Sequence, residues 1–196
     1  RNVTRHSNIF AILFSIADET KQEKILKNVL ENDEIPAITT PYFNFFELDV
    51  LCRMGKLTEV LDKIRSYWGG MLDLGAVTFW EEYDPSVPKE EQYDMYGDHF
   101  GKSLCHAWAA SPIYFLAKYF AGLDLVNKDG VTYILKPQMQ YFTELDCTLP
   151  VGSNGVVRLV WDGEILEITP NADGGILELG EQKLFLVRGE TRRVKI

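Results

Sequence analysis

The residues with the clearest capacity for chemistry lie in an aromatic and acidic segment, residues 75–85. Phe79 and Trp80 come directly before Glu81, while Glu82 and Asp84 follow it. We expect the rings to exclude water from the Glu81 carboxylate and the neighbouring carboxylates to repel its charge, and both effects favour the protonated acid. Because aromatic faces cover the apolar faces of sugar rings, a carboxylate beside them suits glycoside chemistry. The segment therefore predicts a sugar-processing site, and the alternative is an exposed acidic loop around a packed tryptophan.

A hydrolase that inverts a glycosidic bond needs two carboxyl groups with different tasks. One carboxylate activates a water molecule, and an acid about 6.5–9.5 Å away protonates the leaving oxygen. Glu81 can supply one member of this pair. Since strand or turn geometry sends successive side chains to opposite sides, we expect only one of Glu81 and Glu82 to face the site.

A second group of candidates lies in residues 103–108, just before an apolar helix, and includes His106 and Trp108. By itself, His106 fits a core histidine that is hydrogen-bonded to the backbone. Its position after the acidic segment also fits a donor to a sugar hydroxyl. Tyr42 and Asn44 begin another apolar helix, and they either line the same site or serve in packing and capping.

The overall composition narrows the class of partner. The 196 residues include 20 Lys and Arg against 29 Asp and Glu, which gives a net charge of −9. Nucleic acid and anionic membrane surfaces are disfavoured, because binding to phosphate needs basic patches and none is present. No stretch reaches the roughly 18 apolar residues of a membrane span. A neutral sugar is compatible with this charge.

No cofactor or metal is expected from the sequence. The three cysteines lie far apart, without the Cys/His spacing of a zinc site. Neither a P-loop nor a Ser/His/Asp order is present. We expect Cys52 and Cys105 to be buried thiols, and the cysteine count leaves the compartment open among cytoplasmic, periplasmic and secreted.

Hydrophobic periodicity changes near residue 125. Helical patterns precede it, at about residues 7–16, 19–32, 41–54, 56–74 and 107–121. Apolar helices alternate with amphipathic ones, which indicates the inner and outer layers of a helical toroid, and we expect the first helix to be buried on all sides. Five helices are too few to close a toroid, so further helices are expected before Arg1. Arg5 and His6 should form a solvated turn, and Ser111-Pro112 should begin the last helix.

Short alternating segments follow, with a long charged loop before them at residues 82–102. Strands are predicted at about residues 131–136, 139–145, 155–161, 164–169, 174–179, 184–187 and 191–196. Asp162-Gly163 between two of them is a strong hairpin signal. The spacing indicates an antiparallel β-sandwich. The predicted fold class is therefore α+β with two domains, a partial helical barrel over residues 1–125 and a β-sandwich over residues 126–196.

At motif level the chain resembles the bacterial α-L-rhamnosidases of glycoside hydrolase family seventy-eight. The matching segments are residues 68–81 and 103–108, together with Arg5-His6-Ser7-Asn8 and Thr40-Pro41-Tyr42-Phe43 before two apolar helices. The motifs cover about residues 1–122, and the strand region agrees with the family's C-terminal β-domain by order only. The resemblance implies an (α/α)6 barrel and inversion at the anomeric carbon of a rhamnose-containing carbohydrate substrate.

The resemblance also implies individual roles. Glu81, the glutamate after tryptophan, would be the general base, and His106 would contact rhamnose; we add Trp80 and Trp108 as substrate-binding rings. The family's general acid lies well upstream of the matched region, so the partner of this chain would be the upstream remainder of the same polypeptide. The 196 residues alone are expected to be inactive. Cys105 stands where the family often has Asn, which bears on substrate preference.

Two other classes of function stay open at this point. A carbohydrate-binding or interaction module would use Trp80, Tyr83 and Trp108 as a stacking platform and Glu81 as a hydrogen-bond partner only. Another (α/α)6 enzyme, either a glycosidase or a lyase, is the further alternative. A lyase that acts on acidic polysaccharides would need basic residues near the site, which the acidic loop does not offer.

Overall fold

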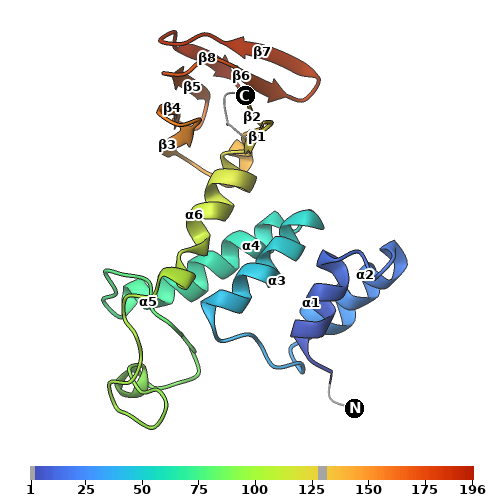
Figure 1. Ribbon diagram of the computed structural model, residues 1–196, viewed down its shortest axis with the longest axis vertical. Helices are drawn as coiled ribbons and strands as arrows, with labels where there is room; N and C mark the ends of the chain where they lie inside the picture. The colour runs from blue at the N-terminus through green and yellow to red at the C-terminus, as the bar shows by residue number, and fades with distance from the viewer. Residues whose placement is uncertain (1–2, 128–131) are drawn as a thin grey trace. The chain divides into compact units, whose positions relative to one another are not determined.

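The computed structural model describes residues 3–127 and 132–196 and divides into two compact units, Arg1–Pro112 and Ile113–Ile196. The first unit is helical with a long loop, and the second contains two β-sheets (Figure 1). The α+β class is therefore confirmed. Among the described residues the helices do not form a closed barrel.

Five α-helices form most of the first unit. They are α1 (Arg5–Leu13), α2 (Glu19–Ile25), α3 (Pro41–Arg53), α4 (Leu57–Lys63) and α5 (Gly69–Asp73). α2 and α4 each continue as a π-helical turn, η1 (Leu26–Leu30) and η2 (Ile64–Trp68). The Asp18 side chain caps α2 by accepting from the Lys21 amide, and Pro41 opens α3. The helices predicted at 19–32, 41–54 and 56–74 are thus confirmed to within a few residues.

The first helix is buried on one side only, which corrects the expectation of complete burial. Ile9 and Ile12 pack into a core with η1 and α3, whose other fully buried members are Leu26, Val29, Leu30, Ile38 and Val50. The helix ends at Leu13, and Ser15 takes a left-handed conformation with φ of 56°. Phe14 and Ile16 are left 69% and 74% exposed.

Arg5 is also corrected. Its guanidinium is buried and forms an ion pair with the buried Glu47 carboxylate of α3. Arg5 Nη2 donates further bonds to the carbonyls of Asn32 and Ile35, each at 3.4 Å. A residue expected in solvent therefore joins α1, α3 and the segment between η1 and α3.

The last helical region begins as predicted at Ser111-Pro112. A 3-10 turn, η4 (Ala107–Ala109), precedes α6 (Ser111–Phe115), which continues as the π-helical turn η5 (Leu116–Phe120). Pro112 falls in the first turn of α6, where its missing N–H leaves no helical bond unmade. Two further 3-10 turns are η3 (Lys89–Glu91) in the long loop and η6 (Met139–Tyr141) in the second unit.

The second unit contains two four-stranded sheets. One has the order β1 (Leu123–Leu125), β2 (Tyr133–Leu135), β6 (Gly175–Leu179) and β7 (Gln182–Leu186), and the other has the order β3 (Leu145–Val151), β4 (Gly155–Trp161), β5 (Ile165–Pro170) and β8 (Arg192–Lys195). All pairs are antiparallel except β2–β6, which is parallel, so the first sheet is mixed. The shared core includes Tyr133, Leu159, Leu166, Ile168 and Leu177.

Strand prediction succeeded where turn chemistry was clear. Asp162 Oδ1 accepts from the amides of Glu164 and Ile165, and Gly163 takes a φ of 96°, which gives the predicted β4–β5 hairpin. The strand predicted at 139–145 is wrong, because η6 and a bend occupy most of it. β1 and β3 were missed, and the start of the strand predicted at 131–136 lies outside the described residues.

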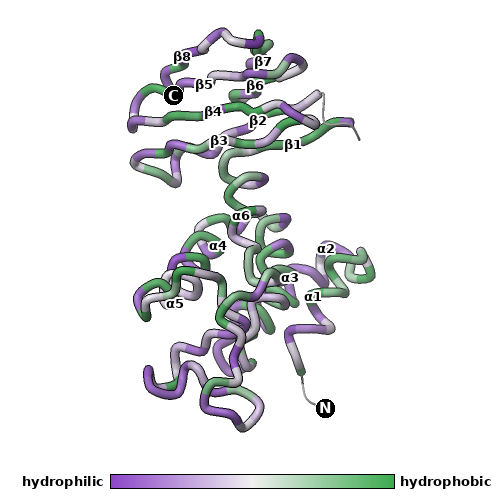
Figure 2. Tube along the Cα trace, turned by 60° about the vertical axis from the view of Figure 1, so that its left-hand side comes forward, coloured by the Kyte–Doolittle hydropathy of each residue, from purple (hydrophilic) through white to green (hydrophobic). Residues whose placement is uncertain are grey.

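An inner strand and an edge strand of the second sheet differ in hydropathy. Figure 2 shows that β4, inside the sheet, is mainly hydrophobic whereas the edge strand β8 is mainly hydrophilic. Arg193 and Lys195 on β8 pair with Glu167 and Glu164 at 3.0 and 2.5 Å. Charged side chains of this kind protect an edge strand from pairing with another chain.

No helix in the described part of the chain combines the length and apolar character needed to cross a bilayer.

Candidate active site

Two short segments of the first unit lie side by side and hold the principal candidates. The Glu81 amide donates to the Ser103 carbonyl at 2.9 Å, and the His106 amide donates to the Phe79 carbonyl at 2.8 Å. Thr78 Oγ1 also donates to the Leu104 carbonyl. Backbone pairing therefore fixes Glu81 beside residues 103–106, and the long loop 82–102 leaves and returns at this point.

The Glu81 carboxylate has defined partners for both oxygens. Oε2 accepts from the Ser103 amide at 3.1 Å, and Oε1 accepts from the Tyr96 hydroxyl at 3.3 Å. His106 Nδ1 lies 4.0 Å from Oε2. The side chain is 20% exposed, so it is partly shielded but still reachable from solvent.

Three rings from two segments, the η4 turn and the start of α3, extend the site away from the carboxylate. The His106 ring meets Trp108 edge-on, with centroids 5.0 Å apart, and Trp108 lies 5.1 Å from Tyr42 at the start of α3. Trp108 is 65% exposed and Tyr42 is 46% exposed. Large exposed rings beside a carboxylate form a surface on which the apolar face of a sugar can lie.

A pocket of about 170 Å³ contains these groups. Its lining includes Glu81, His106 and Trp108 from the predicted site, and the other contributors are Thr40, Pro41, Tyr42, Met95 and Tyr96. Tyr42 therefore faces the site, whereas Asn44 is buried and donates to the carbonyls of Ile38 and Thr40 at 3.1 and 3.2 Å, in the packing and capping role. Among the lining residues, Glu81 alone carries a carboxylate.

Trp80 and Glu82 flank Glu81 in sequence but do not line this pocket. Trp80 is 3% exposed, with its ring 5.6 Å from that of Tyr93 in the long loop. Glu82 Oε1 accepts from Thr39 Oγ1 at 3.0 Å. The expectation that only one of the two glutamates faces the site is confirmed.

Tyr96 was not identified from the sequence. It lies in a tight turn closed by the Met95–Asp98 bridge, and both Tyr96 and Gly97 have positive φ, 55° and 81°. A tyrosine rarely adopts this conformation, which marks a position held by its surroundings. The Glu81 carboxylate raises the pKa of the Tyr96 hydroxyl, so that group stays a hydrogen-bond donor. The adjacent Gly97 was the available signal, because it suits a turn with two positive φ values.

The walls of the site are anchored by buried side chains. Trp68 Nε1 donates to the Ala109 carbonyl at 2.8 Å, which ties η2 to the turn that carries Trp108. The Tyr67 hydroxyl donates to the Thr39 carbonyl and accepts from the Tyr83 amide at 3.1 Å. Burial raises the pKa of Tyr67 well above its usual value. These bonds connect η2 to the segments that contain Thr39, Tyr83 and Ala109.

One buried lysine, Lys102, lies among the carboxylates near the site. Lys102 is 8% exposed, and burial lowers its pKa although Glu82, Asp84, Asp94 and Glu81 act in the opposite direction.

The described residues contain no group of three or more His, Cys, Asp or Glu side chains arranged to hold a metal. Cys105 is exposed, not buried as expected, while Cys52 is buried. The arrangement can hold a neutral hydroxylated ligand against one carboxylate.

Comparisons with known proteins find solved structures with a similar fold. No protein-family model and no curated protein matches the sequence. Among solved structures, a family seventy-eight rhamnosidase of Bacillus sp. GL1 has a TM-score of 0.71 and 22% identity, covering 91% of this chain and 19% of that chain. A rhamnosidase from Klebsiella oxytoca with rhamnose bound has a TM-score of 0.54 and 33% identity, covering 61% of this chain and 23% of that chain.

The chain thus spans about a fifth of the length of either enzyme. Over most of its own length, it is similar to the rhamnosidases of glycoside hydrolase family seventy-eight, which confirms the resemblance that its motifs predicted.

Proposed function

We propose that this chain is part of an inverting α-L-rhamnosidase, in which Glu81 is the general base. The observation that carries the proposal is the pocket in which one carboxylate, Glu81, faces His106 and the exposed ring of Trp108. Structural similarity to two rhamnosidases supports a glycoside hydrolase, and the solved structure with bound rhamnose supports that sugar as the ligand.

In the proposed mechanism, Glu81 removes a proton from water as the water attacks the anomeric carbon. The Ser103 amide and the Tyr96 hydroxyl hold the carboxylate in one orientation, which keeps it aligned with the attacking water. His106 donates to a sugar hydroxyl, and Trp108 with Tyr42 covers the apolar face of the ring. Trp80 supports the site from the interior, since it is buried against Tyr93.

The remaining parts of the machinery are assigned to the upstream polypeptide. An inverting reaction needs an acid about 6.5–9.5 Å from the base, and no second carboxylate lines the pocket in the described residues. We assign residues 1–125 to the C-terminal part of an (α/α)6 barrel and residues 126–196 to a β-sandwich domain. In this assignment, the exposed side chains of Phe14 and Ile16 pack against the remaining barrel helices.

The stereochemistry of the product tests this proposal. The complete polypeptide that carries this chain should release β-L-rhamnose first from an aryl α-L-rhamnoside, as followed by proton NMR before the anomers equilibrate. The 196-residue chain alone should show no normal turnover. Initial release of the α-anomer would exclude an inverting base, and absence of rhamnoside hydrolysis by the complete polypeptide would exclude the enzyme.

A binding module is the second candidate, and the exposed rings of Trp108 and Tyr42 favour it. Such a platform can hold a sugar without a catalytic acid. The isolated chain would then bind rhamnose, Trp108→Ala would abolish binding, and Glu81→Gln in the complete polypeptide would leave rhamnoside turnover unchanged. Binding by the chain together with loss of turnover in Glu81→Gln would favour the enzyme.

A further inference from the structure

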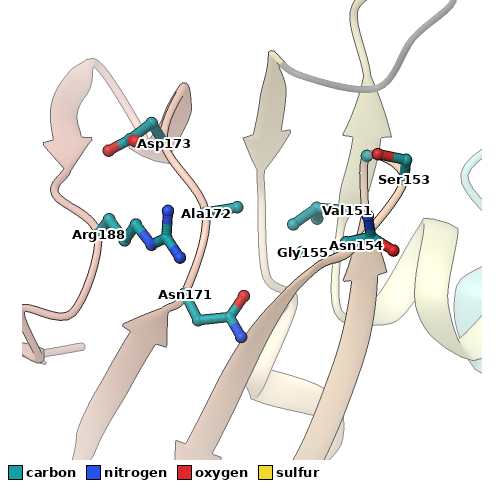
Figure 3. A pocket seen from close by; sticks show the side chains of 9 residues that line it. Val151, Ser153, Asn154, Gly155, Asn171, Ala172, Asp173 and Arg188 are labelled. Carbon is teal, nitrogen blue, oxygen red and sulfur yellow. The ribbon is translucent and has the colours of Figure 1, made fainter.

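A second polar pocket lies at one end of the β-sheet unit, where three turns meet (Figure 3). It has a volume of about 300 Å³, which is at the lower end of the range for small-ligand sites. The β3–β4 turn supplies Ser153 and Asn154, the β5–β6 loop supplies Asn171 and Asp173, and the β7–β8 turn supplies Arg188.

Backbone contacts hold the three turns together without using most of these side chains. The Asn171 amide donates to the Val156 carbonyl at 2.9 Å, and the Val156 amide donates back to Asn171 Oδ1 at 2.8 Å. The Gly189 amide donates to the Pro170 carbonyl at 2.8 Å. Gly155 allows the close approach, because a Cβ there would lie 2.6 Å from the Ala172 Cβ and the Val151 carbonyl oxygen. The pocket is therefore formed before any ligand binds.

Several polar side chains that line the pocket have hydrogen-bonding groups that no described residue uses. Within the described residues, the side chains of Ser153, Asn154, Asp173 and Arg188 make no hydrogen bond or ion pair. Asn171 uses only its Oδ1, which leaves Nδ2 as a free donor. By contrast, Arg158 on β4 pairs with Asp146 at 2.7 Å. Figure 3 shows Arg188 reaching from its own turn toward the Asn171–Asp173 loop.

The chemistry of these groups selects a kind of ligand. A guanidinium presents a planar fork of donors that matches a carboxylate in two parallel bonds, and Asn171 Nδ2 adds donors on the same loop that Arg188 approaches. Asp173 and Asn154 can accept bonds from hydroxyl groups, while Val151 and Ala172 give an apolar surface. Asp173 repels a second carboxylate, which favours Arg188 as the partner of a ligand's anionic group. The hydroxyl groups of the ligand then face Asp173 and Asn154.

We propose that this pocket binds a sugar residue that carries a carboxylate, that is, a uronic acid residue, with its carboxylate on Arg188 and its hydroxyl groups on Asp173 and Asn154. Glucuronate is a suitable probe, because it joins a carboxylate to a hydroxylated ring of this size. Its affinity for an open polar pocket should be modest, with a dissociation constant of about 1 mM.

An NMR titration of the 15N-labelled 196-residue chain tests the proposal with glucuronate, glucose and acetate as separate probes. Glucuronate should shift the amides of Gly152, Gly155 and Gly174 in a saturable manner, and it should bind about tenfold more tightly than glucose or acetate. Equal affinities for glucuronate and glucose, shifts outside the three turns, or no saturable shift would overturn the proposal.

A matched pair of arginine variants separates recognition from net charge. Arg188→Gln should weaken glucuronate binding about tenfold and leave glucose binding unchanged. Arg65→Gln removes an exposed arginine from the other unit and should change neither. Equal weakening by both variants would indicate general electrostatic attraction and would contradict the assigned site. The titration requires no turnover, so its outcome is independent of the role proposed for Glu81.

Discussion

His106 Nδ1 lies 4.0 Å from Glu81 Oε2, with both side chains about one-fifth exposed. The two residues are held by backbone bonds between the segments that contain them, Glu81 N to Ser103 O and His106 N to Phe79 O. A carboxylate and an imidazole are thus fixed on one wall of a pocket, while Trp108 and Tyr42 form another part of it. Local backbone pairing therefore positions Glu81 and His106, and the long loop adds Met95 and Tyr96 to the same pocket.

Tyr96 is predicted to be a positioning residue for Glu81. Tyr96→Phe removes the hydroxyl that donates to Oε1 and should reduce kcat about tenfold with KM little changed, because the lost bond orients the base and does not hold the sugar. Steady-state kinetics of the complete polypeptide measure kcat and KM separately.

Tyr93→Phe is the control for that variant, because the Tyr93 ring packs on Trp80 and lies in the same loop. It should leave both kcat and KM unchanged. If Tyr96→Phe behaved like Tyr93→Phe, the hydroxyl of Tyr96 would have no role in orienting the base.

Much of this site could be anticipated from the sequence, because its parts lie in two short segments. The carboxylate and rings around Glu81 and His106 indicate chemistry by type and spacing alone. Tyr96 could not be found in this way, since its contact with Glu81 depends on how a long loop folds back. The helical pattern of residues 41–54 predicted the limits of α3 well. The first helix was expected to be buried on every side, but it is buried on one side only, and Phe14 and Ile16, which follow it, are exposed.

Other differences have equally specific causes. Pro150 argues against a strand in sequence, but β3 is an edge strand, where a missing N–H is tolerated. The parallel pairing of β2 with β6 joins distant parts of the chain, and local patterns carry no information about it. Arg5 was expected in solvent because its buried partner, Glu47, lies on a different helix.

The buried pair of Arg5 and Glu47 should be strongly coupled. Arg5→Leu leaves the Glu47 carboxylate buried without its partner and should lower the free energy of unfolding by about 3–5 kcal/mol. The double variant Arg5→Leu/Glu47→Leu should recover most of this loss, because two apolar side chains bury no unpaired charge. Urea unfolding of the four proteins in a double-mutant cycle gives the coupling energy. Additive losses would show that the two side chains do not act as a pair.

Trp68 is predicted to hold the turn that carries Trp108. Trp68→Phe keeps most of the ring but leaves the Ala109 carbonyl without its donor, and it should lower the free energy of unfolding by about 1–3 kcal/mol. Trp108→Phe, at an exposed position, should change it by less than about 0.5 kcal/mol. Equal losses in the two variants, measured by urea unfolding, would contradict the anchoring role.

Tyr67 should make the fold sensitive to alkaline pH. Its pKa is raised in the folded chain by burial, so the folded state binds a proton that the unfolded state releases above about pH 10. This contribution to stability is complete below the unfolded pKa and is lost as the pH rises through the folded one. Between about pH 9 and 11, the original chain should therefore lose more stability than Tyr67→Phe. Parallel pH dependences in chemical denaturation would show that Tyr67 does not titrate in this way.

The most direct test of the central claim is rhamnoside hydrolysis by the complete polypeptide with Glu81→Gln, compared with Glu82→Gln. Glu82 is the control because it follows Glu81 in sequence, yet its carboxylate accepts from Thr39 outside the pocket. We predict that Glu81→Gln loses turnover by about three orders of magnitude or more with its fold intact. Azide, a nucleophile with no proton to remove, should restore cleavage by this variant. Glu82→Gln should remain close to the original rate. Unchanged turnover in Glu81→Gln, or the same loss in both variants, would contradict the assignment of Glu81 as the base.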